Sequence, residues 1–92
     1  MVQMTQHAEV RMQQRGITRQ TLESLLSYGA QSYDHRGAIV VYFDKGARFR
    51  FLREGGRCAY QQVEKQLNAY AVMADDGRVV TVGHRDRRIP RL

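Results

Sequence analysis

The sequence predicts an α+β domain in which two N-terminal helices pack on a small antiparallel β-sheet. Residues before Ala30 show helical spacing, with a capping residue before each helix and a glycine after it. Beyond Ala30 the pattern changes to short β-rich runs joined by glycine-containing turns. The 92 residues form one domain, spanning 1–92, with a short basic tail at the C-terminal end.

The first helix is expected over 7–17, preceded by Thr5 as N-cap and closed by Gly16. Ala8 and Met12 fall on one line of its surface. The second helix is expected to follow Thr18 and to end at Gly29. The apolar residues of the second helix have i, i+3, i+4 spacing and are expected to supply much of the core: Leu22, Leu25 and Leu26.

The two helices also permit a helix-turn-helix, in which Arg19, Gln20 and Glu23 would face a DNA major groove. The strand-like segment that follows argues against this alternative, because such a unit usually has a further supporting helix.

Two hairpins are expected in the sheet. The first joins strands 30–35 and 38–43 through a turn at 36–37, which places Tyr33 opposite Val40. The second joins strands 67–74 and 78–84 through a type I′ turn at Asp76-Gly77. This turn places Met73 opposite Val80, Ala71 opposite Val82 and Ala69 opposite His84, so that His84 ends the row facing the helices.

Between the hairpins, Asp44 is a candidate N-cap for a helix over 45–53, and another short helix is expected over 57–65. The alternation over 48–51 leaves a strand as the alternative for the first of these. Three arginines make this segment a second basic cluster: Arg48, Arg50 and Arg53.

The first helix carries a polar stripe where an amphipathic helix would be apolar. His7, Arg11 and Arg15 lie between its apolar positions. One interpretation is a pocket for an anion such as phosphate. The other is structural: the arginine stems cover apolar surface, and the charged ends reach water or a carboxylate such as Glu23 or Asp34.

The charge balance favours an acidic partner. Fifteen Lys and Arg oppose nine Asp and Glu, for a net charge of +6, and only Lys45 and Lys65 are lysine. Arginine suits phosphate and stacks on bases, so nucleic acid or an acidic protein is indicated, although codon bias also enriches arginine. Without a membrane-spanning run or a signal peptide, and with Cys58 alone, a cytoplasmic location is expected.

Two motifs lie at opposite ends of the chain, His7-Ala8-x-x-Arg11-Met12-x-x-Arg15-Gly16-Ile17 and Asp76-Gly77-Arg78-Val79-Val80-Thr81-Val82-Gly83-His84-Arg85. With them the chain resembles the bacterial proteins grouped as domain of unknown function 4258, over nearly its whole length. That family has been placed among the RelE-like toxins and the wider barnase–EndoU–colicin–RelE group of metal-independent ribonucleases. The resemblance implies a RelE-like fold and RNA as a partner, and it makes His7, Arg11, Arg15, Thr81, His84 and Arg85 motif residues.

Metal-free RNA cleavage needs a base, an acid and cations that stabilise the phosphorane. We expect His7 and His84 to act as the base and the acid that transfer the protons. We expect Arg11 to stabilise the charge on the phosphorane and Thr81 to orient a neighbouring residue. The expected phosphate and RNA contacts come from the other arginines of the basic segments: Arg15, Arg48, Arg85, Arg87 and Arg88.

The rival hypothesis is a non-catalytic binding module for nucleic acid or for an acidic, antitoxin-like protein. The arginines of the tail are then either a phosphate-contacting arm or a solvated end. No cofactor or metal is expected, because His7, His35, His84 and Cys58 match no ligand spacing.

Overall fold

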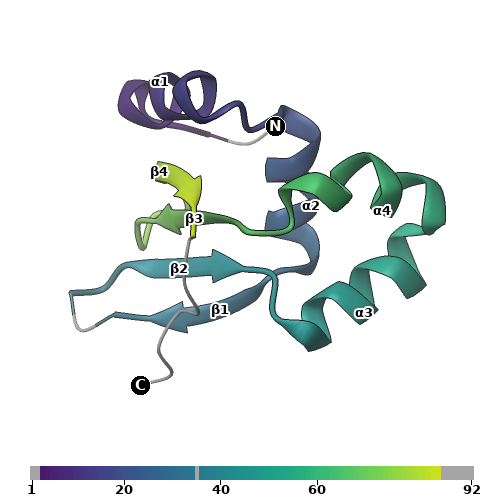
Figure 1. Cartoon of the computed structure of the whole chain (residues 1–92). Coiled ribbons are helices and arrows are strands. Elements are labelled where there is room, and N and C mark those ends of the chain that lie inside the picture. Colours follow the sequence, from purple (N-terminus) through teal and green to yellow (C-terminus); the bar gives the residue numbers. More distant parts are fainter. Residues whose placement is uncertain (1–2, 35, 86–92) are drawn as a thin grey trace.

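The computed structural model describes residues 3–34 and 36–85 of the chain. It is an α+β domain, as predicted, in which four α-helices accompany a four-stranded antiparallel sheet (Figure 1). The elements in chain order are α1 (Gln6–Arg15), α2 (Arg19–Tyr28), β1 (Ala30–Tyr33), β2 (Ile39–Tyr42), α3 (Lys45–Gly55), α4 (Arg57–Val63), the 3-10 helix η1 (Glu64–Gln66), β3 (Ala69–Met73) and β4 (Val79–His84).

The strands are ordered β1-β2-β3-β4, so each strand pairs with its neighbour in sequence. Val41 pairs with Ala71 and Ala71 pairs with Val82, and all three side chains are buried. We call the face that carries this row the helix face, because buried residues of all four helices join it in one core. The opposite, second face carries a row that is half-buried: Val40, Val72 and Thr81.

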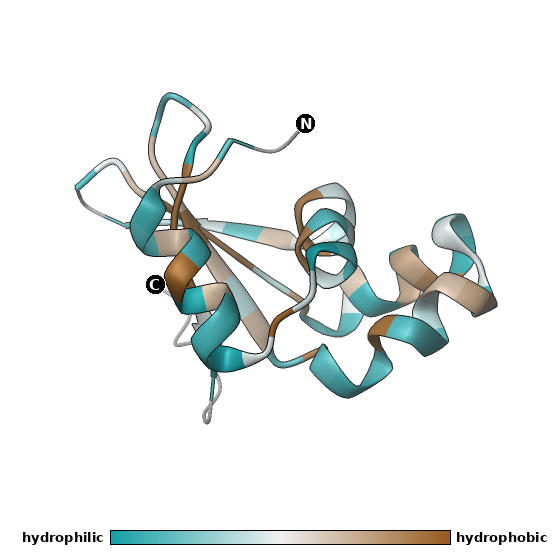
Figure 2. Cartoon of the chain, turned by 90° about the horizontal axis from the view of Figure 1, so that it is seen from above, coloured by the Kyte–Doolittle hydropathy of each residue, from teal (hydrophilic) through white to brown (hydrophobic). Residues whose placement is uncertain are grey.

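Helix α1 lies along the edge strand β4 and is hydrophilic over most of its length (Figures 1 and 2). It begins where Thr5 donates its backbone N–H to the Val79 carbonyl oxygen at 3.0 Å. Ala8 and Met12 attach the helix to the core, as their spacing predicts.

An aromatic cluster joins α3 to the rest of the core. The Phe51 ring stacks on Tyr28 and on Phe43, with centroid distances of 5.1 and 5.7 Å. On α4, Tyr60 contacts the same ring at 5.4 Å. The cluster holds α3 and α4 beyond the end of β2.

The predicted caps are confirmed. Thr5, Thr18 and Asp44 each accept a hydrogen bond from the backbone N–H three residues later. Gly16 has φ of 66°, the left-handed conformation expected after α1. The segment after Asp44 is a helix and not a strand, whereas the single helix expected over 57–65 is divided into α4 and η1.

Both hairpin tips are one residue longer than predicted. In the first, the Asp34 N–H donates to the Ala38 carbonyl oxygen, and Tyr33 pairs with Ile39. The expected pairing of Tyr33 with Val40 is therefore wrong.

In the second tip, the Ala74 N–H donates to the Arg78 carbonyl oxygen. Gly77 has a positive φ of 89°, whereas Asp76 does not have a positive φ. A type I′ turn needs positive φ at both positions, so that prediction is wrong, and the loop holds three residues.

A β-bulge restores the predicted register in the rest of the second hairpin. Met73 pairs with Val79, and Val72 pairs with Thr81, so Val80 is the additional residue on β4. The expected pairing of Met73 with Val80 is wrong. Ala71 does pair with Val82, and Ala69 with His84, as predicted.

The helix-turn-helix alternative does not fit this arrangement. Helix α2 leads into β1, and the Gln20 amide donates a hydrogen bond to Gln62 of α4 at 2.5 Å. The first two helices are thus parts of a helix-on-sheet domain.

Candidate functional site

The polar stripe of α1 is largely exposed to solvent. His7 and Arg15 are exposed, and only Arg11 is half-buried. Within α1, only Ala8 and Met12 are buried against the core. The expectation that the stripe faces the rest of the protein is therefore wrong for His7 and Arg15.

His84 ends the helix-face row, as predicted, and contacts two elements there. Its Nε2 lies 2.9 Å from the Arg15 carbonyl oxygen, and its Nδ1 lies 3.0 Å from Asn68 Oδ1. Because a carbonyl oxygen only accepts, Nε2 carries the proton of that hydrogen bond. The imidazole thus joins the end of α1 to the start of β3.

The structure does not bring His7 and His84 together. His7 lies in the first turn of α1, whereas His84 contacts Arg15, the last residue of that helix. Eight residues of α-helix separate the two positions by roughly 12 Å along the axis. The described residues therefore do not assemble the expected pair of histidines around one phosphate.

Arg85 follows the last residue of β4, and its side chain extends across the second face to the end of β2. Its guanidinium lies over the Tyr42 ring at 5.1 Å from the centroid. It also donates a hydrogen bond to the Phe43 carbonyl oxygen, while the Arg85 backbone N–H donates to the Asn68 carbonyl oxygen at 2.9 Å. These contacts fix the guanidinium at the end of the sheet.

Arg48 of α3 lies close enough to Arg85 for the two charges to repel each other. Burial lowers the pKa of Arg85 below its ordinary value, and the Arg48 guanidinium lowers it further. Tyr42 and Asp44 act in the opposite direction. We call the two arginines, Arg48 and Arg85, the Arg48–Arg85 pair.

The Arg48–Arg85 pair retains unused donor capacity. Among the described residues, the buried Nε of Arg48 has no hydrogen-bond partner. One oxygen of the Asp44 carboxylate, Oδ1, already accepts from the Ala47 N–H at 2.7 Å. A partly buried pair of cations with a free N–H donor is a suitable site for an anion.

The remaining predicted residues lie elsewhere. Thr81 is in the middle of β4 on the second face, opposite Val72. Arg11 lies on α1. Arg87 and Arg88 are outside the described residues.

Two tyrosines on the second face, Tyr42 and Tyr70, are not among the site residues that the sequence predicts. Tyr42 pairs with Tyr70, and Tyr70 pairs with Gly83. A Cβ on Gly83 would lie 3.0–3.1 Å from Tyr70 ring atoms, so that ring covers the glycine. Strand alternation predicts that Tyr70 and Gly83 pair on the face opposite His84, which the structure confirms, but alternation does not mark that face as a site.

The described residues contain no cluster of three or more His, Cys, Asp or Glu residues suited to a metal ion. No helix in ranges 3–34 and 36–85 combines the length and hydropathy needed to cross a bilayer.

A family model described as Domain of unknown function (DUF4258) matches residues 4–84. The chain belongs to this family. The DUF4258 match includes Arg48 and His84, and Arg85 follows its last residue. Comparison with curated proteins and with solved structures gives no match.

Proposed function

We propose that the chain binds RNA and that the Arg48–Arg85 pair holds one of the RNA phosphates. The observation that carries this proposal is the buried Arg48 Nε–H, which has no partner among the described residues and belongs to a side chain whose charge acts on Arg85. An anion between the two groups relieves their repulsion and accepts the free hydrogen bond.

RNA is the phosphate source that fits the rest of the chain. The net charge of +6 favours a polyanion, and the placement of the DUF4258 family among RelE-like ribonucleases favours RNA. The Tyr42 ring beside Arg85 adds an aromatic surface next to the phosphate site. Aromatic rings and arginines together are typical of surfaces that bind single-stranded RNA.

Fluorescence anisotropy tests this proposal with a labelled single-stranded RNA of about ten nucleotides, a length that one small domain can cover. Arg48→Gln and Arg85→Gln are each expected to weaken binding about tenfold, the effect of losing one charge-assisted contact. Each should also reduce the slope of log K against log salt by about 0.7. Arg53→Gln is the matched control, because Arg53 is exposed on the same helix and pairs with Glu54 at 3.5 Å.

Equal affinities for Arg48→Gln, Arg85→Gln and Arg53→Gln would contradict the proposal. Absence of RNA binding by the folded wild-type protein would contradict it more directly. In that case, binding of an acidic peptide would favour the protein-partner alternative.

Metal-independent RNA cleavage, which the family resemblance implies, is a second candidate. His84 and Arg85 are consecutive, but the His84 side chain lies on the helix face and the Arg85 side chain on the second face, so His84 would have to leave its present position before it could move a proton at a phosphate held by the Arg48–Arg85 pair. The Nε2 atom would first have to leave the Arg15 carbonyl oxygen. EDTA-resistant cleavage of the same RNA that His84→Gln abolishes would support it, and binding without cleavage would exclude it for that substrate.

A further inference from the structure

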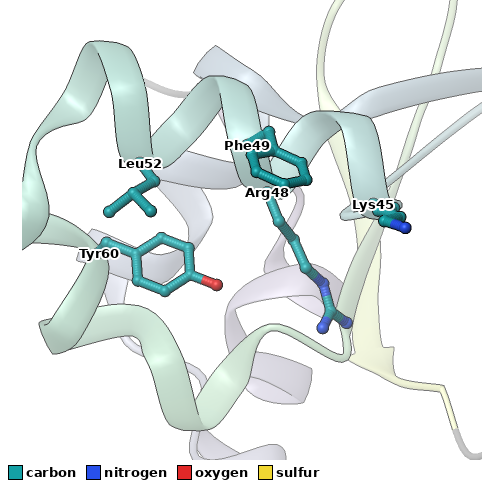
Figure 3. Close-up of a pocket in the computed structure, with 5 residues that line it drawn as sticks. All are labelled: Lys45, Arg48, Phe49, Leu52 and Tyr60. Atoms are coloured by element: carbon teal, nitrogen blue, oxygen red, sulfur yellow. The ribbon is translucent and has the colours of Figure 1, made fainter.

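A pocket of about 220 Å³ lies between α3 and α4, and Arg48 of the Arg48–Arg85 pair contributes to its lining. It is lined by Lys45, Arg48, Phe49, Leu52 and Tyr60 (Figure 3). The hydroxyl end of Tyr60 points toward the Arg48 side chain, and Lys45 lies on the other side of that side chain (Figure 3). The pocket thus has an aromatic and aliphatic wall and a cationic end.

Packing among residues 3–34 and 36–85 does not account for the apolar wall. Phe49 is 64 % exposed and Leu52 is 40 % exposed, although both lie on a helix whose Ala47 and Phe51 are fully buried. Large apolar side chains grouped at a pocket are typical of a binding surface.

We infer that this pocket receives one unpaired nucleobase of the bound RNA, next to the phosphate held by Arg48. The inference rests on the proposed function and extends it by naming the part of the nucleotide that each group contacts. Phe49 and Tyr60 supply aromatic surface for the base, and Arg48 and Lys45 supply charge for the backbone.

The size of the pocket favours a single base. Its volume is below the approximately 300–1,000 Å³ of pockets that enclose drug-sized ligands. A single flat ring system suits this space, whereas a base-paired nucleotide does not present its ring faces. The pocket therefore favours single-stranded RNA over a duplex.

Arg48 connects the two parts of the site. Its side chain lines the pocket, and its charge acts on Arg85. A nucleotide whose base is in the pocket can therefore place its phosphate at the Arg48–Arg85 pair without leaving Arg48. Because the same arginine lines the pocket and belongs to the cationic pair, the site suits a nucleotide better than an uncharged apolar ligand.

The test compares two exposed aromatic residues. Phe49→Ala removes the ring at the pocket, and Tyr33→Ala is the matched control, because Tyr33 is 67 % exposed at the far end of the β1–β2 hairpin. Anisotropy is measured with single-stranded RNA, with a duplex RNA of the same length and with a single strand whose bases have been removed. Circular dichroism melting checks that each variant folds.

Phe49→Ala is expected to weaken binding of single-stranded RNA about 5- to 100-fold, the effect of removing one stacking aromatic. Its salt dependence should remain that of the wild type, because no phosphate contact is lost. Affinity for the duplex and for the base-free strand should not change. Phe49→Tyr should restore binding, whereas Tyr33→Ala should bind as tightly as the wild type.

The inference fails if Phe49→Ala binds single-stranded RNA as tightly as Tyr33→Ala does. It also fails if Phe49→Ala weakens binding of the base-free strand equally. In either case, a loss in Arg48→Gln would leave the phosphate proposal intact. If the wild type binds none of these RNAs, both the inference and the proposed function fail.

Discussion

The imidazole Nε2 of His84 lies 2.9 Å from the carbonyl oxygen of Arg15, so the end of β4 is joined to the end of α1. Helix ends leave carbonyl groups without partners inside the helix. Here the neighbouring strand supplies one of the missing donors. His84 therefore has a structural role in the described chain, whatever its part in chemistry.

His84→Ala should lower the free energy of unfolding by about 1 kcal/mol, because water replaces part of the two hydrogen bonds that are lost. For a domain of this size that loss lowers Tm by roughly 4–8 °C. Asn68→Ala removes only one of the two contacts and should have a smaller effect. Thermal denaturation measures both, and an unchanged Tm in His84→Ala would show that the contacts contribute nothing to stability.

The Gln66 side chain connects the α1–α2 junction to η1. Its Oε1 accepts from the Thr21 hydroxyl at 2.6 Å and from the Thr18 N–H at 3.2 Å, and its Nε2 donates to the Gly16 carbonyl oxygen at 2.6 Å. Gln66→Ala should destabilise the fold by about 1–3 kcal/mol, since Thr21 is buried and loses an acceptor.

Gln66→Glu provides a control for this network. It keeps the oxygen acceptors but loses the donor to Gly16, so chemical denaturation should place its stability between those of the wild type and Gln66→Ala. Equal stability of all three proteins would show that the network is not a significant stabilising contact.

Gly29 is required where α2 turns into β1. A Cβ there would lie 2.4 Å from the Leu25 carbonyl oxygen and 2.6 Å from Val41 Cγ1. Gly29→Ala should therefore destabilise the protein by about 1–3 kcal/mol or more, as overpacking does.

Gly46→Ala is the matched control for Gly29→Ala. Its Cβ would meet only Asp44 Oδ1, at an ordinary distance of 3.7 Å, and the position is helical. A change between zero and about 1 kcal/mol of stabilisation is expected. Comparable losses in both variants, measured by urea unfolding, would contradict the close contact at Gly29.

Anions should stabilise the protein through the Arg48–Arg85 pair. Sulfate that binds the folded state raises Tm by mass action, in addition to its general effect on protein stability. At matched ionic strength, replacing chloride by sulfate should therefore raise Tm more in the wild type and in Arg53→Gln than in Arg48→Gln. The same rise in all three would indicate the general effect alone.

The prediction of the helices succeeded because it rests on contacts between residues that are close together in the sequence. Thr5, Thr18 and Asp44 cap helices within three residues, and such contacts depend on neighbouring sequence alone. The strand register depended on the lengths of the turns. One additional residue in the first tip changed the partner of Tyr33 from Val40 to Ile39. In the second hairpin, the bulge at Val80 compensated for the additional residue in the tip, so the register beyond the bulge is the predicted one.

The candidate site was less accessible to sequence reasoning. Arg48 and Arg85 were both expected to contact phosphate, but in separate basic segments. Their meeting depends on the order β2-β3-β4, which brings Phe43 to the Arg85 guanidinium. The chemistry of cleavage suggests pairing His7 with His84, but a helical projection shows only the faces of a helix and not which of its ends meets a strand.

The most direct test of the central claim follows the arginine side-chain Nε–H resonances by ¹⁵N NMR during titration with single-stranded RNA. Binding at the Arg48–Arg85 pair should shift the Nε–H signals of Arg48 and Arg85 and leave that of Arg53 in place. Shifts confined to Arg11 and Arg15, with the Arg48 signal unchanged at saturation, would contradict the account and move the site to α1.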